Sequence, residues 1–308
     1  MLSKYRAEFE EHVTAMWSSM NTLREVHDRM RLVETAEKLG IPVPETWLLN
    51  EVPDWNRELI VKSRYNILAE DYVDSLAPGE CVVNKAVTYP EPGEEPDIET
   101  IRRKEEYTPI VQKVILDVPG VEYAFRALYD HGELVTMGQK RQARRETYAG
   151  GASVYRESID DPRLEELGRT LLDSMEWHGL ASVQFLKDAD TGEFRLLEVN
   201  PRIWGSVVCD IRTGADFPYH YWLLAGDAST PIEYDYEAGY AIHYLFGELQ
   251  YLMSVLRENY PDVDQPTFRA TLWNVVSSCY TDPHFDYLSL MTLDRSFTAF
   301  EPHCPIGA

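Results

Sequence analysis

The sequence predicts an α/β (α+β) fold of two lobes followed by a helical extension. Short apolar segments typical of strands alternate with segments whose apolar residues recur at helical spacing. A chain of 308 residues can bury a substantial core, and its length predicts two lobes or domains. The third observation is a hairpin near residue 190, in which polar side chains recur on one face of an apolar strand.

The first clear helix is expected from about Thr22 to Gly40. Thr22 and Glu25 have the spacing of a capping box. Apolar residues then recur at helical spacing at Leu23, Val26, Met30, Val33 and Leu39. Gly40 is typical of the residue that ends a helix, and Pro42 cannot continue one. The residues before 21 are mixed in composition and also predict helix.

Turn residues divide the rest of the chain into further strands and helices. Strands are expected at 46–49, 58–62, 81–89, 110–115, 121–129 and 133–139. The stretch 89–97 is rich in Pro, Gly and Glu and predicts a solvated loop. Helices are expected at 98–106, 161–177, 206–212 and 218–224, the second opening on Asp161-Pro162. Leucines at 245, 249, 252 and 256 predict a helix in the C-terminal section.

Two strands, 181–187 and 194–200, are expected to form a hairpin around the turn residues 188–192. If this hairpin centres on Thr191, Gln184 lies directly opposite Glu198, close enough for both to bind one ion. Alternate residues of a strand share a face, so Glu198, Asn200 and Arg202 should project in the same direction.

These side chains suit a magnesium–nucleotide complex. Gln184, Glu198 and Asn200 supply the oxygen ligands that Mg²⁺ prefers. Arg202 can form a bidentate contact with a phosphate or acyl-phosphate oxygen. Polar groups on an otherwise apolar strand need partners, which such a complex would provide. The alternative interpretation is a surface strand with an ordinary ion pair.

The segment 196–202, LLEVNPR, resembles the signature strand of the ATP-grasp superfamily, which has the order E-x-N-x-R. Further similar motifs follow the order of the family, over 28–226. They are Asp28-Arg29, LGIPVPET at 39–46, ELIVK at 58–62, IVQKVI at 110–115 and VPGVEY at 118–123. WGS at 204–206 and GADFP at 214–218 resemble a branch of carboxylate–amine ligases.

This resemblance implies an ATP-grasp fold that binds ATP and Mg²⁺ between two lobes. It also implies phosphoryl transfer from ATP to a substrate carboxylate, giving an acyl-phosphate and ADP, followed by attack of an amine. The implied division is a helical extension at 1–27, an N-lobe with a lid at 28–116, a C-lobe with the signature strand at 117–230, and a mainly helical extension at 231–308.

The resemblance assigns nucleotide contacts to five positions. Lys62, at the end of a strand, and Arg29, where the family commonly has a second lysine, would hold phosphates. Gln112 would accept from the adenine amine, and backbone groups near Lys113 and Ile115 would complete adenine recognition. The plainer interpretations stay open: a strand-end lysine that reaches water, an exposed helix arginine, and ordinary strand residues.

Two arginines are assigned to the reaction itself. Residues 140–145 are mostly basic and precede Gly150-Gly151. Cations around a transferring phosphoryl group accelerate its transfer, and Arg141 is the preferred candidate because it should share a strand face with Gln139. Arg202 would stabilise the same group. A flexible surface turn is the alternative for the two glycines.

Three departures from the family pattern leave other functions open. Gln184 stands where the family has Glu or Asp, which should weaken a second Mg²⁺. The loop after Lys62, expected to close as a lid over 64–74, is not glycine-rich. Only 27 residues precede Asp28, so either the chain is a truncated version of the family or a partner or homo-oligomer supplies the missing domain. The alternatives are a nucleotide-binding regulatory or catalytically attenuated protein, and an ATP-grasp kinase or thiol ligase.

The net charge of −23 excludes nucleic acid as an expected partner, because no basic stripe offsets the acidic surface. The chain has 21 arginines and 8 lysines, a pattern that resembles proteins of salt-adapted archaea; an acidic mesophilic enzyme is the alternative. No signal peptide or membrane span is expected, and the four dispersed cysteines predict free thiols. The expected location is therefore cytoplasmic, with small-molecule carboxylate and amine partners.

Overall fold

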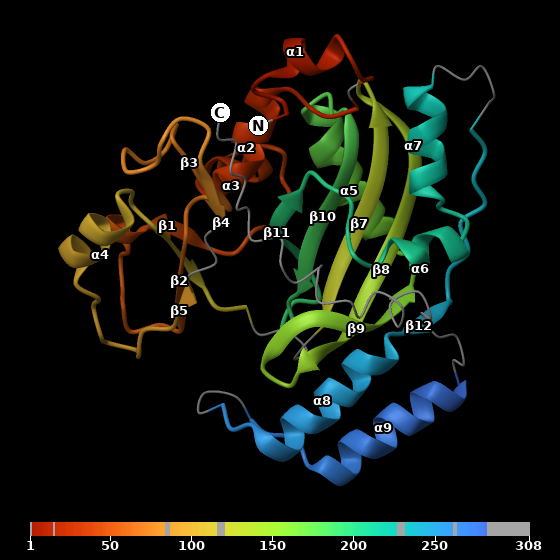
Figure 1. Ribbon diagram of the computed structural model, residues 1–308. Coiled ribbons are helices and arrows are strands. Elements are labelled where there is room, and N and C mark those ends of the chain that lie inside the picture. Colours follow the sequence, from red (N-terminus) through yellow and green to blue (C-terminus); the bar gives the residue numbers. More distant parts are fainter. Residues whose placement is uncertain are drawn as a thin grey trace.

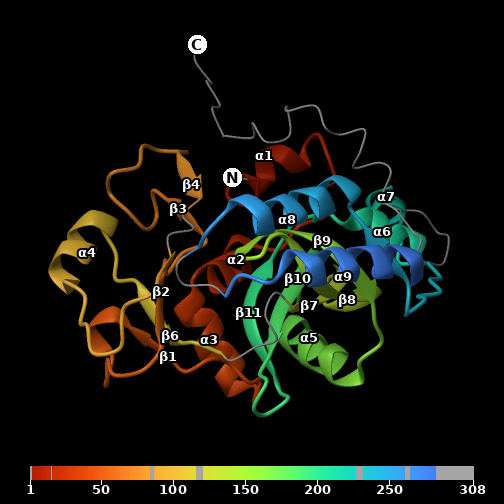
Figure 2. The ribbon, with the colours of Figure 1, turned by 90° about the horizontal axis from the view of Figure 1, so that it is seen from below.

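The computed structural model describes residues 2–14, 16–83, 87–115, 121–226, 232–260 and 264–281 (Figure 1). Two sheets lie side by side, and the second and third helices of the chain lie between them in the views of Figures 1 and 2. The N-terminal helices are α1 (Arg6–Glu10), α2 (Met20–His27) and α3 (Arg29–Lys38). None of the helices in the described ranges is long and apolar enough to cross a membrane.

The N-lobe is a four-stranded antiparallel sheet in the order β1-β6-β2-β5. Its strands are β1 (Thr46–Leu48), β6 (Ile110–Lys113), β2 (Leu59–Lys62) and β5 (Val87–Thr88). One face packs on helix α4 (Ile98–Glu105) and the short helix η1 (Leu49–Glu51), burying a core of Leu49, Leu59, Val61 and Val111. Strands β3 (Ile67–Ala69) and β4 (Cys81–Val83) form a separate hairpin.

The C-lobe is a six-stranded antiparallel sheet in the order β11-β10-β7-β8-β9-β12. Its strands are β7 (Glu122–Asp130), β8 (Glu133–Thr147), β9 (Gly150–Ser158), β10 (Gly179–Lys187), β11 (Phe194–Asn200) and β12 (Ala241–His243). Helix α5 (Pro162–Ser174) covers one face. Gly168 of α5 lies against the ring of Phe125, where a Cβ would come within 2.3 Å of the ring, so the helix approaches the sheet closely.

The other face of the C-lobe sheet is only partly covered. Helix α6 (Val207–Arg212) and helix α7 (Phe217–Ala225) pack on it, with Trp204 and Phe217 against Leu128. Helices α8 (Leu245–Arg257) and α9 (Phe268–Thr281) pack on each other beyond the curled end of β8 and β9. The lobes meet at β11, whose Leu196 N–H donates to the carbonyl of Pro42 at 2.9 Å.

Several predicted elements are corrected by the structure. The helix expected over 22–39 is two helices, because Asp28 is extended (φ −85°, ψ 102°) and its carboxylate caps α3 by accepting from the N–H groups of Met30 and Arg31. The strand expected at 133–139 continues to Thr147, and β9 and β12 were not predicted. The expected boundary at 116/117 lies outside the described residues, as does part of the strand expected at 81–89.

Candidate functional site

The hairpin of β10 and β11 places the predicted metal ligands together. Gln184 pairs with Glu198 and Ser182 pairs with Asn200, so the predicted register is confirmed. Directly paired residues point to the same face of an antiparallel sheet, so Gln184, Glu198 and Asn200 share the face that α6 and α7 leave partly uncovered. A register shift after Gln184 pairs Phe185 with Leu196. The predicted pairing therefore holds from Ser182 to Gln184, next to the site, and not in the part of the hairpin nearer the turn.

The oxygen atoms of this set suit Mg²⁺. Asn200 Nδ2 donates to Glu198 Oε1 at 2.8 Å, which holds the two side chains side by side. Glu198 is 28% exposed and Gln184 is half-buried. One carboxylate and two amide oxygens are hard ligands, and a Mg²⁺ ion commonly completes its six positions with phosphate oxygens and water. The donor set therefore fits Mg²⁺ bound together with a nucleotide.

Two cations from the N-lobe lie beside these ligands. Arg29, the first residue of α3, places Nη2 at 3.5 Å from Glu198 Oε2 and donates from Nη1 to the carbonyl of Ser63 at 2.6 Å. Burial lowers the pKa of Arg29, and the charge of Glu198 opposes that shift. The pKa of Lys62 is lowered to about 8, first by burial and then by the charge of Arg29. Arg29 therefore contacts Glu198, and Lys62 lies close enough to Arg29 and Glu198 for their charges to shift its pKa.

Of the residues predicted to contact adenine, only Gln112 has its side chain beside Lys62. Gln112 is buried on the face of the N-lobe sheet that carries Lys62, accepting from Lys62 Nζ at 3.0 Å and donating to Thr46 Oγ1 at 3.0 Å. The side chain of Lys113 lies on the surface, 3.5 Å from Glu45, and its backbone N–H donates to the carbonyl of Glu45. Ile115 lies just beyond β6 and is half-buried.

Arg141 is not on the face of the metal ligands. Lys140 stands in the cross-strand row of Glu198, Gln184 and Ala124, so Arg141 points to the opposite face. There Arg141 Nη1 donates to Glu157 Oε2 at 2.8 Å. The predicted position of Arg141 rested on its sharing a face with Gln139, and Gln139 is itself on the opposite face. Which residues of β8 share a face with Glu198 depends on the pairing of β8 with β7 and of β7 with β10, which the sequence does not reveal.

Arg202 does not continue the strand. β11 ends at Asn200, and the next residue is Pro201, which has no N–H for a ladder. The N–H of Arg202 donates to the carbonyl of Asn200 at 3.0 Å, and its exposed side chain donates to the carbonyl of Ile203 at 3.1 Å. The strand alternation on which the predicted shared direction depends therefore covers Glu198 and Asn200 and ends before Arg202.

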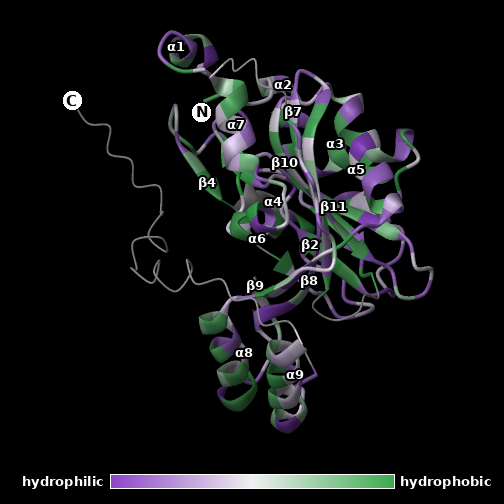
Figure 3. Cartoon of the chain, turned by 90° about the vertical axis from the view of Figure 1, so that its right-hand side faces the viewer, coloured by the Kyte–Doolittle hydropathy of each residue, from purple (hydrophilic) through white to green (hydrophobic). Residues whose placement is uncertain are grey.

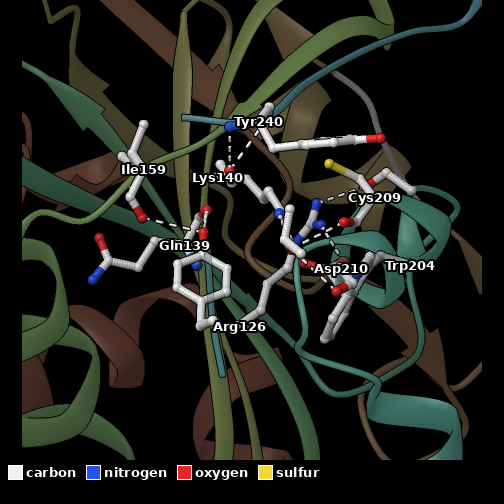
Figure 4. A network of polar contacts seen from close by, with 12 residues as sticks. Arg126, Gln139, Lys140, Ile159, Trp204, Cys209, Asp210 and Tyr240 are labelled. Carbon is white, nitrogen blue, oxygen red and sulfur yellow. Dashed lines mark hydrogen bonds and ion pairs between the residues drawn. The ribbon is translucent and has the colours of Figure 1, made fainter. Parts of the chain in front are cut away.

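A buried ionic network, missed in the sequence, lies on the same face of the sheet (Figure 4). Arg126 donates to Asp210 Oδ2 at 2.8 Å and to Ser206 Oγ at 2.7 Å, and Trp204 Nε1 donates to the same oxygen of Asp210 at 2.6 Å. Lys140 Nζ, fully buried, lies 3.4 Å from Asp210 Oδ1. The network fixes the segment that follows Asn200 against β7 and β8, beside the hairpin that carries the metal ligands.

The segment after Lys62 is held to the start of α3. Arg64 forms a bidentate contact with Asp28, with its Nη2 at 2.7 Å from Oδ2, and its carbonyl accepts from the N–H of Arg29 at 2.9 Å. The ring of Tyr65 stacks on Tyr72 at 4.1 Å. The segment after Lys62 is therefore held in place by side-chain contacts, and it lacks the glycine-rich sequence of the family pattern. A cavity of about 300 Å³ opens beside Lys62 and Ser63, between β2, β5 and α4.

Comparison with known proteins identifies the shared fold. Residues 111–245 match the family model described as "ATP-grasp in the biosynthetic pathway with Ter operon". No curated protein matches the sequence significantly. Among solved structures, pyruvate carboxylase from Rhizobium etli aligns with a TM-score of 0.56 at 17% identity, over 78% of this chain and 21% of that chain.

Two further solved structures contain nucleotides. The biotin carboxylase domain of 2-oxoglutarate carboxylase from Hydrogenobacter thermophilus, in complex with MgADP, has a TM-score of 0.55 at 14% identity, over 78% of this chain and 55% of that chain. Carboxyaminoimidazole ribonucleotide synthase from Aspergillus clavatus, complexed with ATP, has a TM-score of 0.55 at 15% identity, over 78% and 61%. The chain therefore spans less than two thirds of the length of all three proteins, and at these identities the likeness shows the fold.

Proposed function

Because this chain is a member of the ATP-grasp superfamily, we propose that it is an ATP-dependent ligase that joins a carboxylate to an amine. The observation that carries the proposal is the contact of Arg29, from one lobe, with Glu198, from the other, while Lys62 lies close enough to both for their charges to shift its pKa. Two cations beside a carboxylate and two amide oxygens form a place for phosphates and a hard metal ion together.

In this proposal the two partly buried cations bind the phosphates of ATP. Lys62 and Arg29 are partly desolvated without a ligand, and the lowered pKa of each reports that cost. Phosphate oxygens would supply the missing counter-charge. Mg²⁺ bound by Glu198, Asn200 and Gln184 would neutralise charge on the phosphates. The protein's part is positioning and charge stabilisation, which supply most of the acceleration in phosphoryl transfer.

The proposed reaction has two steps. The substrate carboxylate attacks the terminal phosphorus of ATP, and the bond to the β-phosphate oxygen breaks to give an acyl-phosphate and ADP. An amine then attacks the acyl carbon, loses a proton and releases phosphate. Arg202, exposed on the segment after β11, is the proposed cation for the transferring group, whereas the position of Arg141 gives it no part in this scheme.

The first test is nucleotide binding measured by thermal unfolding with and without Mg-ATP. We expect ATP at about 100 times its dissociation constant to stabilise the natural chain by about 2.7 kcal/mol. Lys62→Ala and Glu198→Ala should lose this stabilisation. Lys113→Ala is the matched control and should keep it, because the Lys113 side chain lies on the surface against Glu45. A well-folded natural chain that shows no shift would refute the proposed site.

Gln184 supports a second candidate, a nucleotide-binding protein with weakened turnover. An amide in place of a carboxylate lowers the negative charge beside Glu198, which disfavours a second Mg²⁺. We expect Gln184→Glu to raise ADP release severalfold at saturating Mg²⁺ if turnover is attenuated, with Gln250→Glu, at an exposed position of α8 outside the proposed nucleotide site, as the control. Unchanged ADP release in Gln184→Glu would remove the basis of this candidate.

A further inference from the structure

Helices α8 and α9 carry two apolar stripes that nothing in the described residues covers. The two helices lie side by side on the outside of the molecule and project from the end of the C-lobe (Figures 2 and 3). Trp273 is 70% exposed and Tyr280 is 88% exposed. The exposed large side chains are Leu245, Phe246, Leu249, Met253 and Leu256 on α8, and Leu272, Trp273, Val276 and Tyr280 on α9.

These side chains form coherent faces. On α8 they recur at intervals of three and four residues, opposite the buried Glu248 and Val255, and on α9 they lie opposite the buried Thr271 and Val275. A two-helix hairpin with an apolar outer face is half of a four-helix bundle.

The inner side of the hairpin is firmly attached. Glu248, which is buried, accepts from Arg144 Nη1 of β8 at 2.6 Å, and its Oε1 lies 2.8 Å from His243 Nδ1. The hydroxyl of Ser254 accepts from the N–H of Tyr148 at 3.3 Å. The hairpin is thus held to the sheet through polar contacts on one side, and its apolar side faces solvent.

We propose that this outer face binds the same face of a second copy of the chain. Charge favours that partner. Between Leu245 and Arg257 and between Phe268 and Thr281, the only carboxylate is the buried Glu248. A chain of net charge −23 repels its own copies wherever acidic side chains meet, and this hairpin is a surface where they do not. A basic partner would instead be drawn to the acidic surface elsewhere.

The exposed area also suits a dimer. Nine large side chains that are about half exposed on average present on the order of 800 Å² to solvent, which is the area per partner in a standard interface. A contact between identical faces closes as a two-fold dimer and does not propagate.

Sedimentation equilibrium of the full chain at several micromolar concentrations tests the proposal. We expect a dimer that becomes tighter as KCl is raised, because salt screens the repulsion between two acidic copies. Leu256→Glu with Trp273→Glu should give a monomer with an unchanged circular dichroism spectrum. The uncharged pair Leu256→Gln with Trp273→Gln should weaken the dimer at least tenfold, which separates lost apolar contact from added charge.

The control is Trp222→Glu. Trp222 is 65% exposed on α7, away from the hairpin, and this variant should remain a dimer. Three results would overturn the proposal: a natural chain that stays monomeric throughout, a dimer that survives the double Glu substitution, or a Trp222→Glu variant that dissociates as readily. The first result would point to a different protein or to the residues after Thr281 as the cover of this face.

Discussion

The ammonium group of Lys62 lies in a setting that disfavours its charge. It is partly buried at the end of β2, its one described acceptor is the neutral Gln112, and Arg29 adds a like charge. Glu198 and Glu122 oppose this effect without cancelling it, and the pKa falls to about 8. A lysine that is easily deprotonated in the free protein gains its proton when an anion arrives, so ligand binding and proton binding are linked at this residue.

We therefore predict that ATP binding weakens as the pH rises above about 8. Below that pH, Lys62 already carries its proton in the free protein, and affinity should be nearly constant. Above it, binding must take up a proton, so the affinity should fall by at most about tenfold per pH unit. Calorimetric titrations from pH 7 to 9.5 measure this slope. Lys62→Arg, which stays protonated, should remove it; an equal slope in that variant would assign the effect to another group.

At the scale of elements, the break between α2 and α3 organises the N-lobe side of the site. Asp28 ends one helix, caps the next and accepts both donors of Arg64, so one carboxylate joins the start of α3 to the segment after Lys62. Arg29 is the first residue of α3, so its position beside Glu198 depends on the contacts by which Asp28 fixes the start of that helix.

Asp28→Ala should reduce the free energy of unfolding by about 2 to 4 kcal/mol, because it removes a cap and leaves the partly buried Arg64 without its partner. Asp161→Ala, which removes the cap of α5 and no described ion pair, should cost about 1 kcal/mol. Urea unfolding of both variants gives the comparison. Equal losses would show that the contact between Asp28 and Arg64 contributes nothing.

The hairpin shows what the sequence could predict. Turn residues between two short strands determine the register, so the pairing of Gln184 with Glu198 followed from counting alone. The same counting failed for Arg141, because its face depends on how β8 pairs with β7, two strands away from β11. The buried contact of Arg126 with Asp210 joins residues 84 apart, and neither position has a local pattern that indicates a partner. Local signals thus predict the hairpin, whereas long-range pairing decides the rest of the site.

At the scale of the whole molecule, the acidic surface is the dominant electrostatic feature. A net charge of −23 spread over one chain destabilises the compact state through self-repulsion, and salt screens that repulsion. The described ion pairs at the surface are mostly exposed, and pairs of that kind contribute little each.

The midpoint of thermal unfolding should therefore rise by several degrees as KCl is increased from about 20 mM to about 300 mM, a range over which the Debye length falls severalfold. Sucrose at matched osmolality is the control, because it acts without screening. A midpoint that is flat in KCl, or that rises no more than in sucrose, would contradict this account and the predicted adaptation to salt.

Under the proposed function, the contact between Arg29 and Glu198 would set the order in which ligands arrive. In the free protein the carboxylate already has a cation beside it, supplied by the chain itself. A magnesium ion that came alone would have to displace that guanidinium while it is still the best partner available. A nucleotide that comes first offers Arg29 its phosphates and releases the carboxylate for the metal. The proposed metal ligand Glu198 would thereby stay paired with Arg29 until the nucleotide is present.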